Sequence, residues 1–430
     1  MSEQKIPQGY KQTEIGVIPD DWEIDKIGNV VSITTGDKNT QDKVTDGLYP
    51  FFVRSQQVEK INSFSFDGEA VLTAGDGVGT GKIFHYINGK FDFHQRVYLM
   101  HNFSEKLNGY YFYIFFSNHF YDRIMSMTAK SSVDSVRREM IADMQIILPS
   151  KYEQTLIATA LSDVDTLISE LEKLITKKQA IKTATMQQLL TGKARLPQFA
   201  LREDGTRKGY KQSELGEVPE DWDVKTYGEV FTFLSTSTNS RDDLSSDGDL
   251  GYIHYGDIHT KWNNRLDLDR QKLPKISRNL VSSALILDGD LIMADASEDY
   301  QGIGKSVEIF NIRNKKIVAG LHTFLLRDKN KILADGFRGY LHAISTVKAA
   351  FDRLATGLKV YGISKNNLTT IFLPVPSIEE QTAIATILSD LDSEIQTLEQ
   401  RLVKTRQIKQ GMMQELLTGK TRLLQGTVNT

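Results

Sequence analysis

Apolar residues between positions 153 and 190 recur at alternating intervals of four and three. An average period of 3.5 is the pattern of a coiled-coil seam, so we predict one helix of about 57 Å over this segment. The seam consists of Ile157, Leu161, Val164, Ile168, Leu171 and Ile175, and a later segment carries Ile384, Leu388, Leu391, Ile395, Leu398 and Leu402 at the same six places. Prolines precede each segment, and Gly192 and Gly419 follow the last apolar residues, as helix start and stop signals should.

A lone helix of this length needs a partner. We therefore predict that the two helices pair antiparallel with each other and act as a spacer. The alternative is that each helix is amphipathic and packs only on its own domain.

The segments 25–150 and 225–376 mix short strand-like runs with few helices. This pattern predicts an α+β domain that occurs twice. The strand candidates are Tyr49–Val53, Ala70–Thr73, Lys82–Tyr86, Val97–Met100, Ile146–Leu148, Gly251–Tyr255, Asp290–Ala294, Ser306–Phe310, His322–Leu326 and Ile371–Val375. One further helix is predicted in each copy, over Leu107–Ser126 and Gly336–Thr356.

The chain is an internal duplication. GYKQTEIGVIPDDWEI at 9–24 returns as GYKQSELGEVPEDWDV at 209–224, and residues 153–196 return at 380–423 with more than half of the positions identical. The regions between these blocks match only in scattered pieces. We call the matched blocks the frame. Their repetition indicates that the frame holds the molecule together, and that the differing segments between the blocks determine what each copy selects.

The fold class that follows is α+β, with two globular domains separated by two long antiparallel coiled-coil helices in an internal pseudo-twofold repeat. The predicted boundaries are a first domain at 1–150, its long helix at 151–196, a linker at 197–208, a second domain at 209–376, its long helix at 377–423 and a tail at 424–430.

Composition narrows the function classes. The chain has 430 residues and no cysteine, which excludes disulfides, thiol nucleophiles and cysteine metal sites. It begins without a signal-peptide pattern, and its most apolar run, Tyr110–Phe116, is too short to span a bilayer. We therefore expect a cytoplasmic protein with no membrane partner. The net charge of −3 means that nucleic acid could bind only through a local patch.

No catalytic constellation is present in the sequence. GDGVGTGK at 75–82 fails the phosphate-loop pattern, because Asp76 and Ile83 stand where that pattern needs other residues. No dinucleotide fingerprint, metal-binding histidine spacing or adenine methyl-transfer motif occurs. We predict no catalytic residue, no metal and no cofactor bound by this chain, and keep an enzyme acting through the 75–82 loop as a remaining alternative.

Polar and basic residues at corresponding places in the two copies are the candidate DNA-binding residues. Such side chains at loop tips can hold phosphates and read base edges. The candidates are Arg54, Ser55, Gln56, Gln57, Lys82, Lys130, Arg137, Arg138, His254, Tyr255, Lys305, Lys359, Tyr361, Ser364 and Lys365.

The arrangement resembles the DNA-specificity subunit of type I restriction–modification systems. The resemblance rests on GYKxTExGxxPxDW at 9–22 and, with Ser213 for Thr, at 209–222; on EQxxIAxxLSDxD, after LP at 148–149 and after VP at 375–376; and on LLTGKxRL at 189–196 and 416–423. It spans essentially the whole chain.

The resemblance implies a non-catalytic subunit whose two domains each read one half of a split, asymmetric target in double-stranded DNA. It implies two methyltransferase partners that carry S-adenosylmethionine and methylate adenine N6, and two motor–nuclease (restriction) partners that use ATP and Mg. The long helices fix the gap between the half-targets. The alternative from another class is a coiled-coil adaptor that presents two protein-binding domains.

Overall fold

The computed structural model describes residues 6–127, 135–298, 302–357 and 361–423. Its contacts divide the chain into two compact units. Unit 1 contains Met1–Glu172 together with Gln400–Thr430, and unit 2 contains Lys173–Glu399. Each long helix begins in one unit and ends in the other, so each unit holds the start of one helix and the end of the other.

A six-stranded mixed sheet forms the centre of unit 1. Its order is β4 (Ser32–Thr35), β9 (Val97–His101), β7 (Phe66–Ala74), β8 (Phe84–Phe93), β5 (Tyr49–Phe52) and β6 (Glu59–Ile61). The run Ala70–Ala74 is buried along its whole length, as expected for a central strand covered on both faces. Strand β5 joins β8 in parallel, and the other neighbours in the sheet are antiparallel.

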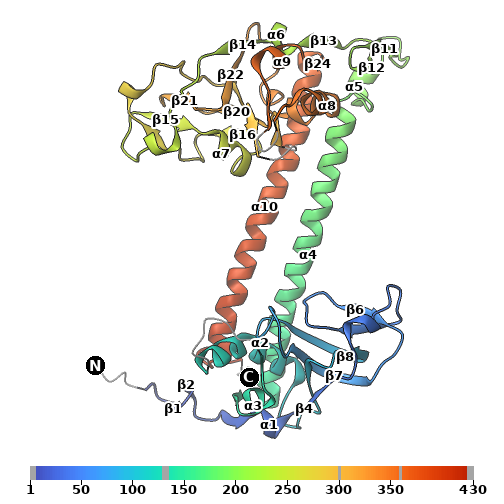
Figure 1. The fold of residues 1–430 in the computed structure, drawn as a ribbon, viewed down its shortest axis with the longest axis vertical. Helices are drawn as coiled ribbons and strands as arrows, with labels where there is room; N and C mark the ends of the chain where they lie inside the picture. The colour runs from blue at the N-terminus through green and yellow to red at the C-terminus, as the bar shows by residue number, and fades with distance from the viewer. Residues whose placement is uncertain (1–5, 128–134, 299–301, 358–360, 424–430) are drawn as a thin grey trace, which may run out of the picture. The chain divides into compact units, whose positions relative to one another are not determined.

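Helix α2 (Gly109–Ser126) packs against β7 and β8 (Figure 1). The Asn108 side chain caps it by accepting the Tyr111 N–H. Phe112, Phe116 and Phe120 are buried one turn apart and stack successively, which gives unit 1 an aromatic core.

Short elements close the domain of unit 1. Hairpin β1–β2 (Tyr10–Thr13 and Gly16–Pro19) comes first, and β3 (Glu23–Lys26) then pairs antiparallel with β10 (Gln145–Leu148). This pair brings the beginning and end of the domain together just before the long helix. The remaining elements are α1 (Ile27–Val30), η1 (Thr40–Asp42) and α3 (Arg138–Ala142).

Unit 2 contains a five-stranded and a three-stranded sheet. The first has the order β14 (Phe231–Leu234), β22 (Thr323–Asp328), β18 (Leu291–Ala294), β20 (Ser306–Phe310) and β16 (Asn264–Asp267); the second is β17 (Lys275–Ile276), β15 (Leu250–Ile253) and β21 (Ile317–Ala319). The order β14-β22-β18-β20 corresponds to β4-β9-β7-β8, so the duplication extends to the sheets.

The frame elements of unit 2 also repeat those of unit 1. Hairpin β11–β12 matches β1–β2, and β13 pairs with β24 as β3 pairs with β10. The bounds are β11 (Tyr210–Ser213), β12 (Gly216–Pro219), β13 (Asp223–Thr226), β24 (Phe372–Val375), β19 (Ala296–Ser297), β23 (Tyr361–Gly362), α5 (Pro197–Ala200), α6 (Tyr227–Val230), α7 (Tyr255–Thr260), α9 (Lys365–Thr369), η2 (Arg241–Asp243) and η3 (Arg278–Leu280).

The single helix predicted over Gly336–Thr356 is wrong. The structure has a 3₁₀ helix, η5 (Arg338–Ala343), and a separate α8 (Ser345–Leu354). The carboxylate of Glu308, which is fully buried, accepts the N–H groups of Gly336 and Gly339 and pairs with Arg338. A buried charge with these partners fixes the tight turn, and periodicity cannot reveal a partner on a distant strand.

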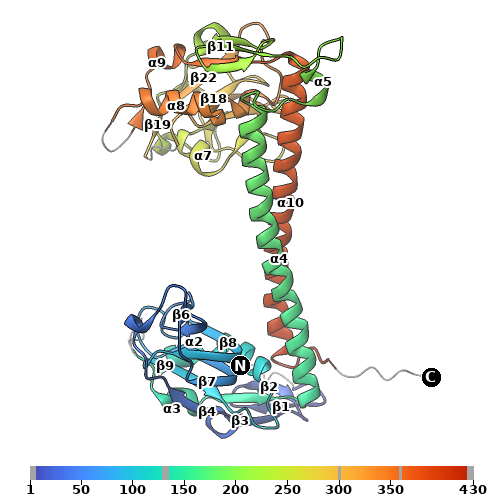
Figure 2. The same cartoon turned by 90° about the vertical axis from the view of Figure 1, so that its right-hand side faces the viewer.

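Helices α4 (Lys151–Leu189) and α10 (Ile378–Leu416) lie side by side in each unit and run in opposite directions (Figures 1 and 2). In unit 2, Lys182 pairs with Asp392 and Lys178 with Glu394. In unit 1, the equivalent pair joins Lys409 to Asp165 at 2.6 Å. The prediction of antiparallel helices in an α+β repeat is confirmed.

All twelve seam residues are buried or half-buried. The first two of each helix belong to the globular cores rather than to the helix pair: Ile157 and Leu161 in unit 1, and Ile384 and Leu388 in unit 2. The helix starts therefore pack on their own domains. The two interpretations of the seam apply to different stretches of the same helix.

Candidate functional site

The repeated frame is held in unit 2 by a cluster of charges around the buried Trp222. Arg195, just past the end of α4, donates from Nε and Nη2 to the two oxygens of Glu380 at 2.7 and 2.6 Å. It also donates to both oxygens of Asp221. The indole Nε1 of Trp222 donates to Glu380 at 2.9 Å. We call Arg195, Asp221, Trp222 and Glu380 the unit 2 clamp.

Unit 1 has the same arrangement, which we call the unit 1 clamp. Arg422 donates to Glu153 and Asp21, and Trp22 Nε1 donates to Glu153 at 3.1 Å. The hydrogen bonds that Arg422 donates to Glu153 and Asp21 raise the pKa of Arg422, so it stays charged. Each LTGKxR motif thus closes the unit in which its own helix ends.

The variable part of unit 1 contains a carboxylate that holds two exposed arginines. Asp76 accepts from Arg54 Nη1 at 2.7 Å and from Arg96 Nη1 at 2.6 Å. The Asp76 side chain is only 16% exposed, whereas Arg54 and Arg96 are 41% and 63% exposed. Burial pushes the pKa of Asp76 up, but the hydrogen bonds from the two arginines outweigh it and hold the pKa below its usual range.

The glycine-rich loop 75–82 lies beside these arginines. Gly77 and Gly81 have φ of +90° and +71°, and Val78 at the loop tip is fully exposed. Lys82 is exposed and lies over the Tyr121 ring at 5.0 Å. The loop thus presents backbone, one apolar side chain and one cation, and it does not have the sequence of a phosphate loop.

The corresponding place in unit 2 is aromatic and histidine-rich. Tyr255 contacts the rings of His254 and His322 at centroid distances of 4.6 and 5.5 Å. His322 pairs with Asp295 at 3.3 Å. His254 is buried, and its Nδ1 accepts the Gly256 N–H and so caps α7; burial lowers its pKa, and the charge of Arg241 lowers it further.

A second carboxylate in unit 2 holds two exposed cations, as Asp76 does in unit 1. Asp257 has a side chain 2% exposed and contacts Arg241 and Lys261, both at 3.1 Å. Arg241 and Lys261 are 56% and 55% exposed. Asp76 and Asp257 occupy different places in their domains, so the charge pattern is shared while its position differs.

The two variable sites share one backbone scaffold. The Gly75 N–H donates to the Arg96 carbonyl at 2.8 Å, and the Asp295 N–H donates to the His322 carbonyl at 3.1 Å. Gly75 and Asp295 in turn accept from the segments that lead into α3 and α9. Arg96 and His322 each stand one residue before the matching strand, β9 or β22. The same backbone positions thus carry different side chains.

The other sequence-predicted residues are more scattered. Ser55, Gln56 and Gln57 follow Arg54; Arg137 and Arg138 are exposed; Lys305 donates to the His259 carbonyl; Tyr361 lies in β23; Ser364 caps α9; and Lys365 lies over the Phe233 ring. Lys130 and Lys359 lie outside the described residues.

The sequence reasoning missed Asp76 as a partner, together with Arg96, Arg241, Asp257, Lys261, Asp295 and His322. A usable signal existed for two of them, since Arg96 directly precedes, and His322 begins, a strand-like run that occurs in both copies. The ion pairs join residues that are 20 and 22 positions apart, and a linear pattern does not show which charges meet.

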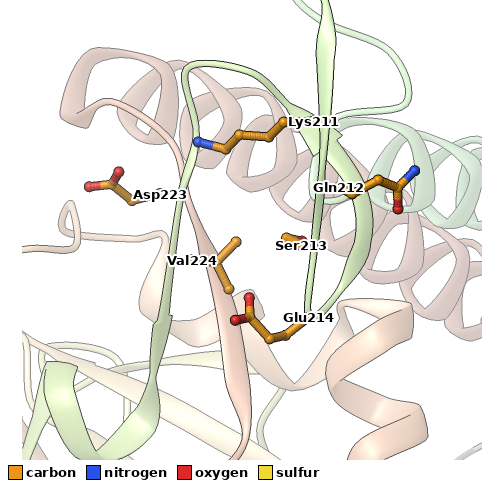
Figure 3. A pocket seen from close by; sticks show the side chains of 6 residues that line it. All are labelled: Lys211, Gln212, Ser213, Glu214, Asp223 and Val224. Carbon is orange, nitrogen blue, oxygen red and sulfur yellow. The ribbon is translucent and has the colours of Figure 1, made fainter.

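Hairpin β11–β12 and β13 border an open hollow of about 560 Å³ (Figure 3). It is lined by Lys211, Gln212, Ser213, Glu214, Asp223 and Val224. Gln212 and Glu214 are exposed, as are Gln12 and Glu14 at the same places in unit 1. Both copies therefore present these same polar groups.

The described ranges contain no group of three or more His, Asp or Glu residues able to hold a metal ion. None of their helices is long and apolar enough to cross a membrane.

The repeated frame and paired helices define a duplicated recognition protein, and comparison with known proteins gives its family. The chain matches the family described as the type I restriction modification DNA specificity domain over residues 19–183 and 219–406. Together these two matches cover most of the chain, so the chain belongs to this family of specificity subunits. Specificity subunits are the non-catalytic recognition components of their systems.

Two relatives are named as specificity subunits of type I restriction enzymes. The chain is 31% identical to the type I restriction enzyme EcoDI specificity subunit of Escherichia coli over 232 residues, about half the length of each protein. It is 25% identical to the type I restriction enzyme MjaVIII specificity subunit of Methanocaldococcus jannaschii over 97% of this chain and 96% of that protein.

Solved structures share the fold. The type I restriction-modification S subunit from M. genitalium superposes with a TM-score of 0.61 at 15% identity, covering 96% of this chain and 97% of that one. A chain from a study of type I R-M complex assembly and conformational transition superposes with a TM-score of 0.50 at 12% identity, covering 94% of this chain and 99% of that one.

Proposed function

We propose that this chain is the DNA-recognition subunit of a type I restriction–modification complex. Its domains, with the predicted bounds 1–150 and 209–376, each read one half of a split, asymmetric target in double-stranded DNA. Helices α4 and α10 set the gap between the halves. The chain performs no chemistry itself and acts in the cytoplasm.

The observation that carries this proposal is the contrast between frame and contents. The unit 1 and unit 2 clamps contain the same four residue types with the same bonds. At the strand ends, by contrast, the side chains differ. Unit 1 has Arg54, Asp76 and Arg96, whereas unit 2 has His254, Asp295 and His322. Two domains on one scaffold with different side chains at this place suit two different base sequences.

We further propose that the frame docks two adenine-N6 methyltransferase subunits. Two copies of one partner need two copies of one surface, and the frame supplies them. Hairpins β1–β2 and β11–β12, with exposed Gln12, Glu14, Gln212 and Glu214, are the candidate surfaces. S-adenosylmethionine would be bound by these partners, and ATP and Mg by two motor–nuclease subunits attached through them.

The decisive test is long-read methylome sequencing of the host with the gene intact, deleted and restored. We expect N6-methyladenine at one split, asymmetric motif to disappear on deletion and to return on restoration. Exchanging residues 25–150 for the same segment of a relative should then change one half of the motif only. An unchanged methylome would refute the proposal and favour the coiled-coil adaptor, whose partners would be sought by pull-down.

Docking can be tested separately. Gln212→Ala with Glu214→Ala should reduce the methyltransferase bound per complex from two copies to one, measured by native mass spectrometry. The matched control is Lys26→Ala, which removes an exposed charge from β3 outside the hairpins. Two copies bound to the double variant would place the docking surface elsewhere.

A further inference from the structure

The cluster of Arg54, Asp76 and Arg96 has a geometry suited to reading bases. Each guanidinium gives one Nη1 hydrogen bond to Asp76. Among the described residues, the other side-chain N–H groups of Arg54 and Arg96 have no protein partner. An arginine has five N–H donors in a rigid fork, so each keeps donors for an external acceptor pair.

We propose that Arg54 and Arg96 read guanine in the half-target recognised by unit 1, and that Asp76 is a positioning residue that aims them. This inference rests on the proposed function and adds the specificity-determining residues. Guanine presents O6 and N7 as adjacent acceptors in the major groove, and a guanidinium fork matches them with two hydrogen bonds.

The charge of the cluster favours bases over phosphates. Asp76 neutralises one of the two arginines, so the cluster carries a net charge of +1 rather than +2. A patch built to hold phosphates would not place a carboxylate between its cations, because phosphate affinity depends on the charge presented. The two guanidiniums are anchored by Asp76, so they lose less conformational freedom on binding than unanchored arginines would. This favours directional hydrogen bonds, such as those to a base.

The neighbouring loop allows a close approach to the DNA. A Cβ added at Gly77 would meet nothing within 4 Å, so the space beside the loop is open. Gly79 lies near the Arg54 carbonyl, which places the loop against the cluster. Val78, fully exposed at the tip, supplies an apolar surface next to the two forks.

The test uses the full chain with its methyltransferase subunits and DNA duplexes in which each base pair of the methylated motif is replaced in turn. Arg96→Ala should lower discrimination at one G·C pair of one half by roughly 5- to 150-fold, the range for one bidentate contact. Arg96→Lys should lose the same discrimination although the charge remains, because an ammonium cannot form the fork.

Asp76→Ala separates positioning from mere folding. It should reduce discrimination at the same base pair, leave the other half-target unchanged and raise affinity for unrelated DNA, since a negative charge is removed. A thermal melt of each variant identifies those that fail to fold. Lys26→Ala, at an exposed cation of unit 1, is the control and should leave discrimination unchanged.

Two outcomes would overturn the inference. Arg96→Lys that keeps full discrimination would exclude reading by the fork. If Arg96→Ala weakens binding to all DNA sequences equally and reduces the salt slope of binding by about 1, Arg96 contacts a phosphate instead of a base. Both are distinct from failure of the proposed function, in which the complex with the unaltered chain would methylate no split motif at all.

Discussion

Arg195 and Glu380 form a double hydrogen bond inside unit 2, with Nε–Oε1 and Nη2–Oε2 distances of 2.7 and 2.6 Å. The pair joins the end of α4 to the start of α10. Arg422 and Glu153 repeat it in unit 1, with distances of 2.7 and 2.8 Å. Each helix therefore begins beside one clamp glutamate and ends beside the clamp arginine of the other unit.

Loss of one clamp partner is predicted to destabilise unit 2 strongly. Arg195 and Glu380 have side chains 7% and 2% exposed, so Arg195→Met leaves a buried carboxylate without its cation. We expect a loss of about 3–5 kcal/mol in the free energy of unfolding, measured by urea denaturation of the full chain.

The matched control for the clamp is the surface pair Lys26–Asp143, whose side chains are 58% and 54% exposed. Lys26→Met should cost about 0–1 kcal/mol. Adding Glu380→Gln to Arg195→Met should recover part of the loss, because the buried charge is then removed. Equal costs for the Arg195 and Lys26 variants would show that the clamp contributes no more than a surface pair.

The glycines that follow the long helices are predicted to be irreplaceable. Gly192 and Gly419 both have φ of +72°, and an added Cβ would lie 2.5 Å from Pro219 or Pro19. Gly192→Ala should cost about 1–3 kcal/mol through backbone strain and overpacking.

Gly411 provides the opposite case within the same protein. It lies inside α10, and an added Cβ would meet nothing within 4 Å. Gly411→Ala should therefore stabilise the chain by up to about 1 kcal/mol, which differential scanning calorimetry would detect as a higher melting temperature. A stabilising Gly192→Ala would contradict the conformation described for the helix end.

Acid should weaken the unit 2 clamp. Burial pushes the pKa of Asp221 up, but hydrogen bonds from Arg195 and Lys208 outweigh it and hold the pKa below the ordinary value of 3.8. A depressed folded-state pKa gives stability that is complete above pH 3.8 and is lost as the pH falls through the folded-state value.

Asp221→Asn isolates this contribution. The difference in unfolding free energy between the unaltered chain and the variant should stay constant from pH 7 to 5 and shrink below about pH 3.8. Urea midpoints at pH 7, 5, 4 and 3 would measure it. A difference that grows on acidification would reverse the sign expected for a salt-bridged carboxylate.

Helix length is predicted to set the gap between the half-targets. Glu172 and Glu399 occupy the same position in the repeat, so seven residues inserted after each add one heptad to both helices. The added length is about 10.5 Å, or roughly three base pairs at 3.4 Å each. Methylome sequencing should show both half-targets unchanged and a gap about three base pairs longer.

The control insertion extends α4 alone. It shifts one part of α4 against α10, so Lys182–Asp392 and Lys409–Asp165 can no longer form together, and the chain should lose methylation altogether. An unchanged gap after the double insertion would exclude the helices as the spacer.

The amino-acid sequence by itself determined the duplication, the two long helices and most of the strands. These features depend on local periodicity and on direct comparison of the two copies: the seam from Ile157 to Ile175 recurs from Ile384 to Leu402, and both segments form helices. Short-range patterns of this kind need no knowledge of distant partners.

Only the tertiary structure decided which charges meet. Arg422 is 269 residues from Glu153, and Asp76 lies 22 and 20 residues from Arg54 and Arg96. Glu308, on a distant strand, breaks the helix that local periodicity predicts near Arg338. Ion pairs and buried caps depend on how sheets bring strand ends together, and hydrophobic period alone does not encode that pairing.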